Sequence, residues 1–158
     1  MRIIIEGADG VGKTTLVNKL AERYNLGVIH CHSKDPNDLD FYYQLLRKNE
    51  VIYDRHLIGE MVYPKIFGRP QKLKEYELEY LLAKSDDLGV SIIILTAGIN
   101  DIEKRLFEKD EFECVLNNIE DINNNFLKLA GKYNIPVINT SNYSIEEVFE
   151  KARSIIDE

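Results

Sequence analysis

The sequence feature that most constrains the fold is a glycine-rich turn near the N-terminus. Residues Gly7–Thr14 fit the pattern G-x-x-x-x-G-K-[ST] without a mismatch. A β-branched run precedes this turn at Arg2–Glu6, and a helical stripe of Leu16, Leu20 and Tyr24 follows it. Such a turn connects a buried strand to a helix, because its glycines let the backbone fold tightly before the helix begins. We therefore expect the chain to begin with the strand, loop and helix of an α/β fold.

Further apolar runs continue the alternation of strands and helices. They lie at Val28–His32, Val51–Asp54, Val90–Leu95 and Ile135–Ile138. Near-continuous apolar strands are typical of a parallel sheet that helices cover on both faces. An apolar stripe from Phe112 to Leu129, ending near Gly131, and a capping box at Ser144–Glu147 predict the last two helices. We expect residues 1–158 to form a single α/β domain around a parallel five-stranded sheet.

The composition limits the range of functions. The 158 residues carry a formal charge of −7, which favours small-molecule partners over long nucleic acids. No stretch approaches the roughly 18 apolar residues needed to span a bilayer, and the N-terminus lacks a signal-peptide pattern. We expect a cytoplasmic protein that does not enter a membrane. Cys31 and Cys114 form no metal-binding or disulfide motif, so both are predicted to lie in the core.

The glycine-rich turn also predicts chemistry. In a P-loop the glycines let backbone N–H groups surround a phosphate, and the adjoining helix adds its positive dipole end. Lys13 is expected to reach the β- and γ-phosphates of a nucleoside triphosphate, while Thr14 offers a hydroxyl oxygen to Mg²⁺. The residues predicted to bind the donor, ATP, are Gly7, Asp9, Gly10, Val11, Gly12, Lys13, Thr14 and Thr15.

Two motifs resemble those of one enzyme family. Glu6–Thr15 is similar to E-G-x-D-G-x-G-K-[ST]-T, and Tyr53–His56, at the end of the third predicted strand, is similar to D-R-[YH]. Both resemble the thymidylate kinase-like family of P-loop nucleotide and nucleoside kinases. Leu57–Arg69 is similar to a region of small virus-encoded kinases of this group, which favours a small viral (phage) or otherwise minimal member. The resemblance implies a three-layer P-loop kinase fold with a short lid.

The second motif adds candidate catalytic residues. At a strand tip beside the P-loop, Asp54 can hold Mg²⁺ or its waters, and Arg55 can bridge the donor and acceptor phosphates as their charge shifts. His56 is expected to hydrogen-bond to backbone rather than to act in catalysis. In the lid that the resemblance implies, Arg105 is the position expected near the adenine and the donor phosphates. Lys109 is the basic residue where longer relatives have a second lid arginine.

The acceptor site is expected to use residues that follow the second and third strands. The candidates for contact with the acceptor are Lys34, Asp35, Tyr42, Tyr43, Arg47, Arg55, Glu60, Tyr63 and Arg69. Tyr42, Tyr43 and Arg47 share a predicted helix, and its aromatic side chains are typical both of a base pocket and of a helix packed on a sheet. Ser33–Pro36 resembles the R-E-P of thymidylate kinases and the E-P of deoxynucleoside kinases, and is also typical of a turn that opens a helix.

The sequence leaves three functions open. The favoured one is an ATP- and Mg²⁺-dependent kinase of (deoxy)nucleoside monophosphates, with a dTMP-like acceptor. The second is a hydroxyl kinase that uses Asp35 as general base on a deoxynucleoside, or on a hydroxymethylated base or an end in DNA. The third is a regulatory P-loop NTPase, although the chain has no N-K-x-D motif and Asp54–Leu57 lacks the glycine of a D-x-x-G switch. A homodimer is also left open.

Overall fold

A parallel sheet of five strands forms the centre of the computed structural model, which describes residues 1–109 and 113–158. The strands are β1 (Arg2–Gly7), β2 (Gly27–His30), β3 (Val51–Asp54), β4 (Val90–Thr96) and β5 (Val137–Asn139). Their order in the sheet is β2-β3-β1-β4-β5, and each neighbouring pair is parallel. The expected α/β fold with a parallel five-stranded sheet is thereby confirmed.

The position of β1 determines where a ligand can bind. β1 pairs with β3 on one side and with β4 on the other, so the strand order reverses beside it. Ligands of open α/β sheets bind outside the carboxyl ends of the strands at such a switch point. Because Ile5 is paired with Asp54, the last residues of β1 and β3 meet at this edge. The glycine-rich turn therefore lies beside the Asp54-Arg55 motif.

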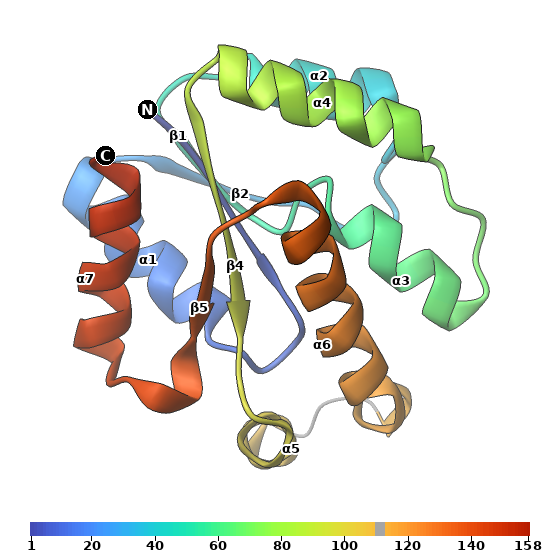
Figure 1. The fold of residues 1–158 in the computed structure, drawn as a ribbon, viewed down its shortest axis with the longest axis vertical. Coiled ribbons are helices and arrows are strands. Elements are labelled where there is room, and N and C mark those ends of the chain that lie inside the picture. Colours follow the sequence, from blue (N-terminus) through green and yellow to red (C-terminus); the bar gives the residue numbers. More distant parts are fainter. Residues whose placement is uncertain (110–112) are drawn as a thin grey trace.

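Helices cover both faces of the sheet. They are α1 (Lys13–Tyr24), α2 (Leu39–Leu46), α3 (Gly59–Phe67), α4 (Glu75–Asp87), α5 (Ile99–Glu108), α6 (Glu113–Tyr133) and α7 (Ile145–Ile156), with a 3-10 turn, η1, at Thr140–Asn142. α1 contacts α7 on one face, whereas α4 and α6 contact β4 on the other face (Figure 1). In the part of the chain described, no helix combines the length and apolarity needed to cross a membrane.

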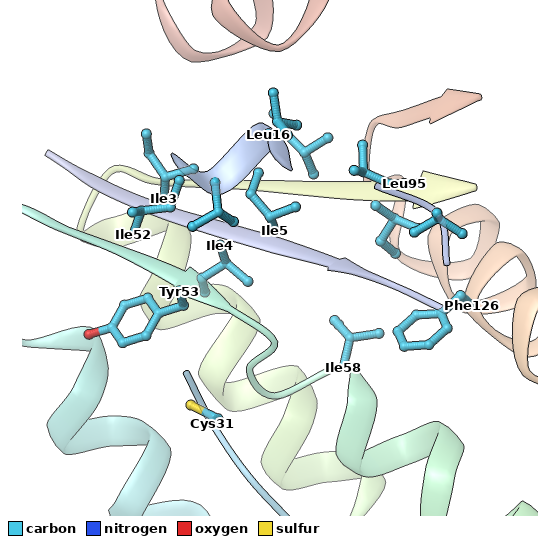
Figure 2. Packing of buried hydrophobic residues seen from close by; sticks show 14 of the residues in the cluster. Ile3, Ile4, Ile5, Leu16, Cys31, Ile52, Tyr53, Ile58, Leu95 and Phe126 are labelled. Atoms are coloured by element: carbon cyan, nitrogen blue, oxygen red, sulfur yellow. The ribbon is translucent and has the colours of Figure 1, made fainter. Parts of the chain in front are cut away.

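The core lies on both faces of β1. Residues Ile3–Ile5 are fully buried, because successive side chains of a central parallel strand point into opposite helical layers. Figure 2 shows Leu16 above this strand in the view, and Ile58 and Phe126 below it. Full burial of one such side chain contributes roughly 1.5–3 kcal/mol. These layers hold the end of β1 rigidly at the switch point.

Local signals predict two of the helix ends. The capping box at Ser144–Glu147 is confirmed: the Ser144 hydroxyl accepts from the N–H of Glu147, and the Ser144 N–H donates to the Glu147 carboxylate. The expected end of α6 near Gly131 lies two residues before the observed one. The helix continues to Tyr133 and ends where Asn134 adopts a φ of 52°, a conformation that asparagine tolerates well. Phe112 lies outside the described residues.

The two cysteines differ in environment. Cys31 is buried as predicted, and burial raises the pKa of its thiol to about 12. The prediction that Cys114 lies in the core is wrong, since this residue is exposed in the first turn of α6. An amphipathic helix has a polar face as well as an apolar one, and a single cysteine does not reveal which face it occupies.

Substitution of Gly7 tests how tightly the end of β1 is packed. Gly7 has a φ of 137°, and a Cβ there would lie 2.3 Å from the carbonyl oxygen of Leu95. We expect Gly7→Ala to lower the free energy of unfolding, measured by urea denaturation, by at least about 2 kcal/mol through strain and overpacking. Gly131→Ala, where a Cβ meets nothing within 4 Å in α6, should instead raise it by roughly 0.5–1 kcal/mol. Equal midpoints of urea unfolding for Gly7→Ala and the wild type would show that the end of β1 has room for a Cβ.

Candidate active site

The P-loop connects the end of β1 to the start of α1. Gly7, Gly10 and Gly12 adopt φ angles of 137°, 77° and 94°, which residues with a Cβ rarely adopt. Lys13 folds back over the loop, and its Nζ donates to the carbonyl oxygens of Gly7 at 2.9 Å and of Ala8 at 2.6 Å. Burial lowers the pKa of Lys13 to about 8. The lysine is therefore held inside the loop and is largely protonated at neutral pH.

Two side chains whose oxygen atoms could bind a metal ion meet beside the P-loop. The Thr14 hydroxyl donates to Oδ2 of Asp54 at 3.0 Å. His30, the last residue of β2, has its Nδ1 3.3 Å from the same carboxylate oxygen. Hydroxyl and carboxylate oxygens suit Mg²⁺, which keeps several waters when it binds together with substrate phosphates. This pair of side chains therefore fits a magnesium ion.

Two cavities open at this edge of the sheet and share a wall. The first, the P-loop cavity, has a volume of about 350 Å³, and Lys13, Thr14 and Asp54 are among its lining residues. The second, the aromatic cavity, has a volume of about 710 Å³ and is lined in part by Tyr42 and Tyr63. The residues that line both cavities are Asp9, Cys31, His32 and Arg55. A group bound in one cavity can therefore meet a group bound in the other at this shared wall.

An ion pair between Arg55 and Asp9 lies in the shared wall. The Tyr63 hydroxyl donates to Oδ2 of Asp9 at 3.0 Å, and the Arg55 guanidinium lies over the Tyr63 ring, 5.7 Å from its centre. Burial, reinforced by the negative charge of Asp9, raises the pKa of Tyr63 far above its ordinary value. Tyr63 is thus a neutral hydrogen-bond donor, and both carboxylate oxygens of Asp9 have partners.

The aromatic cavity gathers most of the predicted acceptor residues. Those that line it are Lys34, Tyr42, Arg55, Glu60, Tyr63 and Arg69. Glu60 is 3% exposed; its Oε1 accepts from the N–H of Lys72 at 3.0 Å, and its Oε2 lies 3.4 Å from Nη1 of Arg69. The Tyr42 hydroxyl donates to Oδ1 of Asn37 at 2.9 Å. The cavity therefore combines aromatic rings with a carboxylate and a guanidinium, which suits a flat polar group.

Tyr43 and Arg47 lie outside this cavity. Consecutive residues on a helix differ by about 100° in direction, so Tyr43 faces away when Tyr42 faces the cavity. The Tyr43 ring instead lies 6.3 Å from that of Tyr80 on α4, and the Arg47 guanidinium lies 6.0 Å from the Tyr43 ring. The structure therefore places these two residues away from the other acceptor candidates, and their contact with the acceptor stays a prediction.

Asp35 does not line the aromatic cavity either. Its Oδ2 accepts a hydrogen bond of 2.6 Å from the N–H of His32, and its own carbonyl oxygen accepts from Nζ of Lys72 at 3.1 Å. The carboxylate thus closes its own turn, as the alternative interpretation of Ser33–Pro36 expected. The role of Asp35 as a general base stays a prediction.

Arg105 joins the P-loop to a third cavity. Its Nη1 donates to the carbonyl oxygen of Gly10 and to Oγ1 of Thr140, both at 3.1 Å. A cavity of about 320 Å³ lies here, with Gly10, Arg105, Thr140 and Tyr143 in its wall. Val11 and Thr15 line the same cavity, which adjoins the P-loop cavity. Of the expected lid, α5 and Lys109 are described, whereas residues 110–112 lie outside the described part.

The sequence interpretation missed Glu6. This residue is 0% exposed at the end of an otherwise apolar strand, and its Oε1 accepts from the N–H groups of His56, Ile58 and Gly59. Its Oε2 has no hydrogen-bond partner among the described residues. A single carboxylate inside an isoleucine-rich run was the available signal, because such a group is rarely buried without backbone donors.

The hydrogen bond expected between the His56 ring and backbone is not formed in the described part of the chain. This residue is 2% exposed, and its two ring nitrogens have no hydrogen-bond partner within the described part of the chain. Its ring packs against Tyr42 and Tyr53, with centres 5.0 Å and 4.6 Å away. Burial lowers its pKa to about 3, so the ring is neutral and serves as an aromatic packing group.

Curated relatives cover nearly the whole chain. A probable thymidylate kinase from Methanocaldococcus jannaschii is 26% identical over 178 residues, covering 94% of this chain and 91% of that protein. A probable thymidylate kinase from Sulfurisphaera tokodaii is 27% identical and covers 98% of this chain and 94% of that protein. No family model matches the chain.

Solved structures share the fold. The YorR protein from Bacillus subtilis, crystallised with phosphorylated GDP, superposes with a TM-score of 0.83 at 21% identity, covering 99% of this chain and 96% of that one. Thymidylate kinase from Candida albicans has a TM-score of 0.65 at 16% identity, with 98% and 90% covered. Deoxyadenosine kinase from M. mycoides has a TM-score of 0.65 at 13% identity, with full coverage of both chains.

The P-loop, the strand order and the Asp54-Arg55 motif together define a P-loop kinase fold. The resemblance to the thymidylate kinase-like family is confirmed by the curated relatives, and the chain is an enzyme of the nucleotide and nucleoside kinase class, a transferase. The viral origin stays a prediction.

The buried Glu6 carboxyl predicts a pH dependence of stability. Burial raises its pKa from an ordinary 4.5 to about 7, although the three N–H donors act against this shift. The folded state therefore holds the proton more tightly than the unfolded state, so this group's contribution to stability is lost as pH rises from 4.5 to about 7. Relative to Glu6→Gln, which cannot titrate, the wild type should lose about 2 kcal/mol between pH 5 and pH 7.

Urea denaturation of both proteins across this pH range measures the difference. Glu147→Gln is the matched control, because its hydrogen bonds to Ser144 lower the pKa of Glu147 and it stays ionised throughout the range. The difference between the wild type and this control should be flat. A flat difference for Glu6→Gln as well would show that Glu6 has an ordinary pKa.

Proposed function

We propose that this chain is an ATP- and Mg²⁺-dependent nucleoside monophosphate kinase for which a dTMP-like acceptor is favoured, with residues 1–158 acting as one kinase domain. The observation that carries the proposal is the shared wall, where Arg55 and Asp9 line both the P-loop cavity and the aromatic cavity. A triphosphate on the P-loop and a monophosphate in the aromatic cavity would meet there. The names of the curated relatives support this choice of acceptor.

The reaction moves the γ-phosphoryl group of ATP to an oxygen of the acceptor phosphate. A new P–O bond forms to the acceptor, the bond to the β-phosphate oxygen breaks, and ADP leaves with the negative charge. Lys13, freed from its carbonyl partners, would balance charge on the β- and γ-phosphates. Arg55 would hold the acceptor phosphate and the transferred group at the shared wall. Mg²⁺, held by Thr14 and Asp54, would supply further neutralisation of the phosphates.

The remaining candidates have supporting roles in this proposal. Arg105, beside Gly10 and Thr140, would contact the donor from the third cavity. Glu60 and Arg69 would bind the acceptor base, with Tyr42 and Tyr63 as aromatic walls and Lys34 at the rim. The cytoplasmic location expected from the sequence stays a prediction.

The hydrogen bonds of Asp35 and Asp9 favour a phosphate acceptor over a hydroxyl acceptor. Asp35 bonds to the N–H of His32, and both oxygens of Asp9 have partners, so neither is an evident general base. A monophosphate needs none, because its attacking oxygen is already ionised near neutral pH. Nothing in the names of the relatives supports a DNA acceptor or a homodimer.

Turnover with a panel of acceptors tests the proposal. ADP release would be measured with ATP and Mg²⁺ against nucleosides, mononucleotides and single-stranded DNA. We expect turnover with mononucleotides, and a loss of at least about a hundredfold in Lys13→Ala, the usual scale for removing an electrostatic contact to the transition state. The control is Lys19→Ala on the same helix, whose lysine pairs with Glu146 at the surface and should leave turnover unchanged. Turnover confined to nucleosides or DNA would overturn the proposal.

Asp35→Asn separates the two kinase mechanisms. Asparagine keeps an oxygen that can accept from the N–H of His32, so the turn should persist. If the acceptor is a phosphate, kcat should stay within about threefold of the wild type, with any change mainly in the acceptor KM. A hydroxyl acceptor would instead lose a general base, at a cost of about a hundred- to ten-thousandfold in kcat and the acidic limb of the pH profile. That result would favour the hydroxyl kinase.

A further inference from the structure

Glu6 ties two separate parts of the site together. It lies in β1 directly before the P-loop, yet its Oε1 accepts from three N–H groups in the segment after β3: His56 at 3.0 Å, Ile58 at 2.8 Å and Gly59 at 3.2 Å. These donors include the first N–H of α3, so the carboxylate also lies at the positive end of that helix. A single oxygen therefore anchors the turn between β3 and α3.

Arg55 is the residue that this turn must hold in shape. Its φ of 71° lies in the left-handed region, which an arginine adopts only when its surroundings enforce it. Its own N–H donates to the carbonyl oxygen of Ile5 at 3.1 Å, next to Glu6 in β1. The backbone on both sides of the strained residue is thus bonded to the end of β1.

The side chain of Arg55 returns to the same place. It pairs with Asp9, which follows Glu6 by three residues in the P-loop, and it lies over Tyr63 of α3. A shift of the turn would carry the guanidinium away from the shared wall of the two cavities. A displacement of about 1 Å in a positioning group can cost a hundredfold in rate.

We propose that Glu6 is a positioning residue for phosphoryl transfer, which holds the strained Arg55 so that its guanidinium stays at the shared wall. The inference rests on the proposed kinase function. Glu6 does not line either of the two cavities, so it acts through Arg55 rather than by touching the substrates. The Oε1 atom is needed because three N–H donors converge on it, and its removal would leave all three buried without an acceptor.

A double-mutant cycle distinguishes positioning from a general loss of structure. Glu6→Met removes the acceptor at similar length, Arg55→Ala removes the guanidinium, and the double variant combines them. For each protein, kcat, the KM values for ATP and for the acceptor, the dissociation constant of the acceptor mononucleotide by calorimetry, and unfolding in urea would be measured. Leu81→Ala, a core substitution in α4 far along the chain from the site, is the control for destabilisation alone.

If Glu6 acts through Arg55, Glu6→Met should lower kcat by about thirty- to a hundredfold and leave the KM for ATP within about twofold. Adding it to Arg55→Ala should then cost no more than about a further twofold, because the guanidinium is already absent. Glu6→Gln, which retains an acceptor oxygen, should recover kcat to within about tenfold of the wild type. Leu81→Ala should unfold earlier with kcat unchanged.

Multiplicative losses in the cycle, or an unchanged kcat in folded Glu6→Met, would overturn the inference. If Glu6→Met does not fold, the same cycle with Glu6→Asp decides, since that change keeps the charge but withdraws the carboxylate by one methylene group. If the wild type turns over no mononucleotide, the proposed function fails, and the calorimetric cycle still judges Glu6: equal losses of acceptor affinity in the single and double variants support positioning, and multiplicative losses oppose it.

Discussion

The pairing of β1 between β3 and β4 is the constraint on which the rest of the structure depends. It brings Gly7 against the backbone of Leu95 on one side and Ile5 beside Asp54 on the other. Parallel strands end at the same edge, so the P-loop and Asp54 meet although they are far apart in the sequence. The helical layers on both faces then hold this edge rigid. Rigidity matters here because the charged groups of a site must be preorganised around the charge that they stabilise.

The cations of the site have hydrogen-bond or ion-pair partners within the chain itself. Arg55 lies with Asp9, Arg69 with Glu60, and Lys13 with backbone carbonyl oxygens. A chain with a formal charge of −7 can thus carry a cluster of cations, because each one has a local partner that phosphates can replace or join. Such preorganisation limits the cost of burying charge, since isolated buried ions would be strongly destabilising.

Motif and periodicity predicted the elements that carry strong local signals. The strands, the P-loop and the capping box at Ser144 follow from short-range patterns, and the structure agrees with them. Composition was a weaker signal, and it did not predict which face of a helix a side chain occupies. Tyr43 and Cys114 point away from the sides expected, because composition alone does not set the rotation of a helix about its axis. Asp35 closes a turn, which a short Asp-Pro motif allows equally well.

The sequence by itself determined that the chain has a phosphate-binding loop between a strand and a helix, because glycine spacing and a following Lys13-Thr14 are local requirements of that loop. The motif at Asp54 and Arg55 also predicted a place beside that loop, but tertiary structure alone decided which residues these side chains and Glu6 contact. The shared wall joins Asp9 to Arg55, and Glu6 anchors the turn beyond β3, through hydrogen bonds between residues about fifty positions apart. Such contacts depend on strand order and register, which arise from packing of the whole sheet rather than from any short segment.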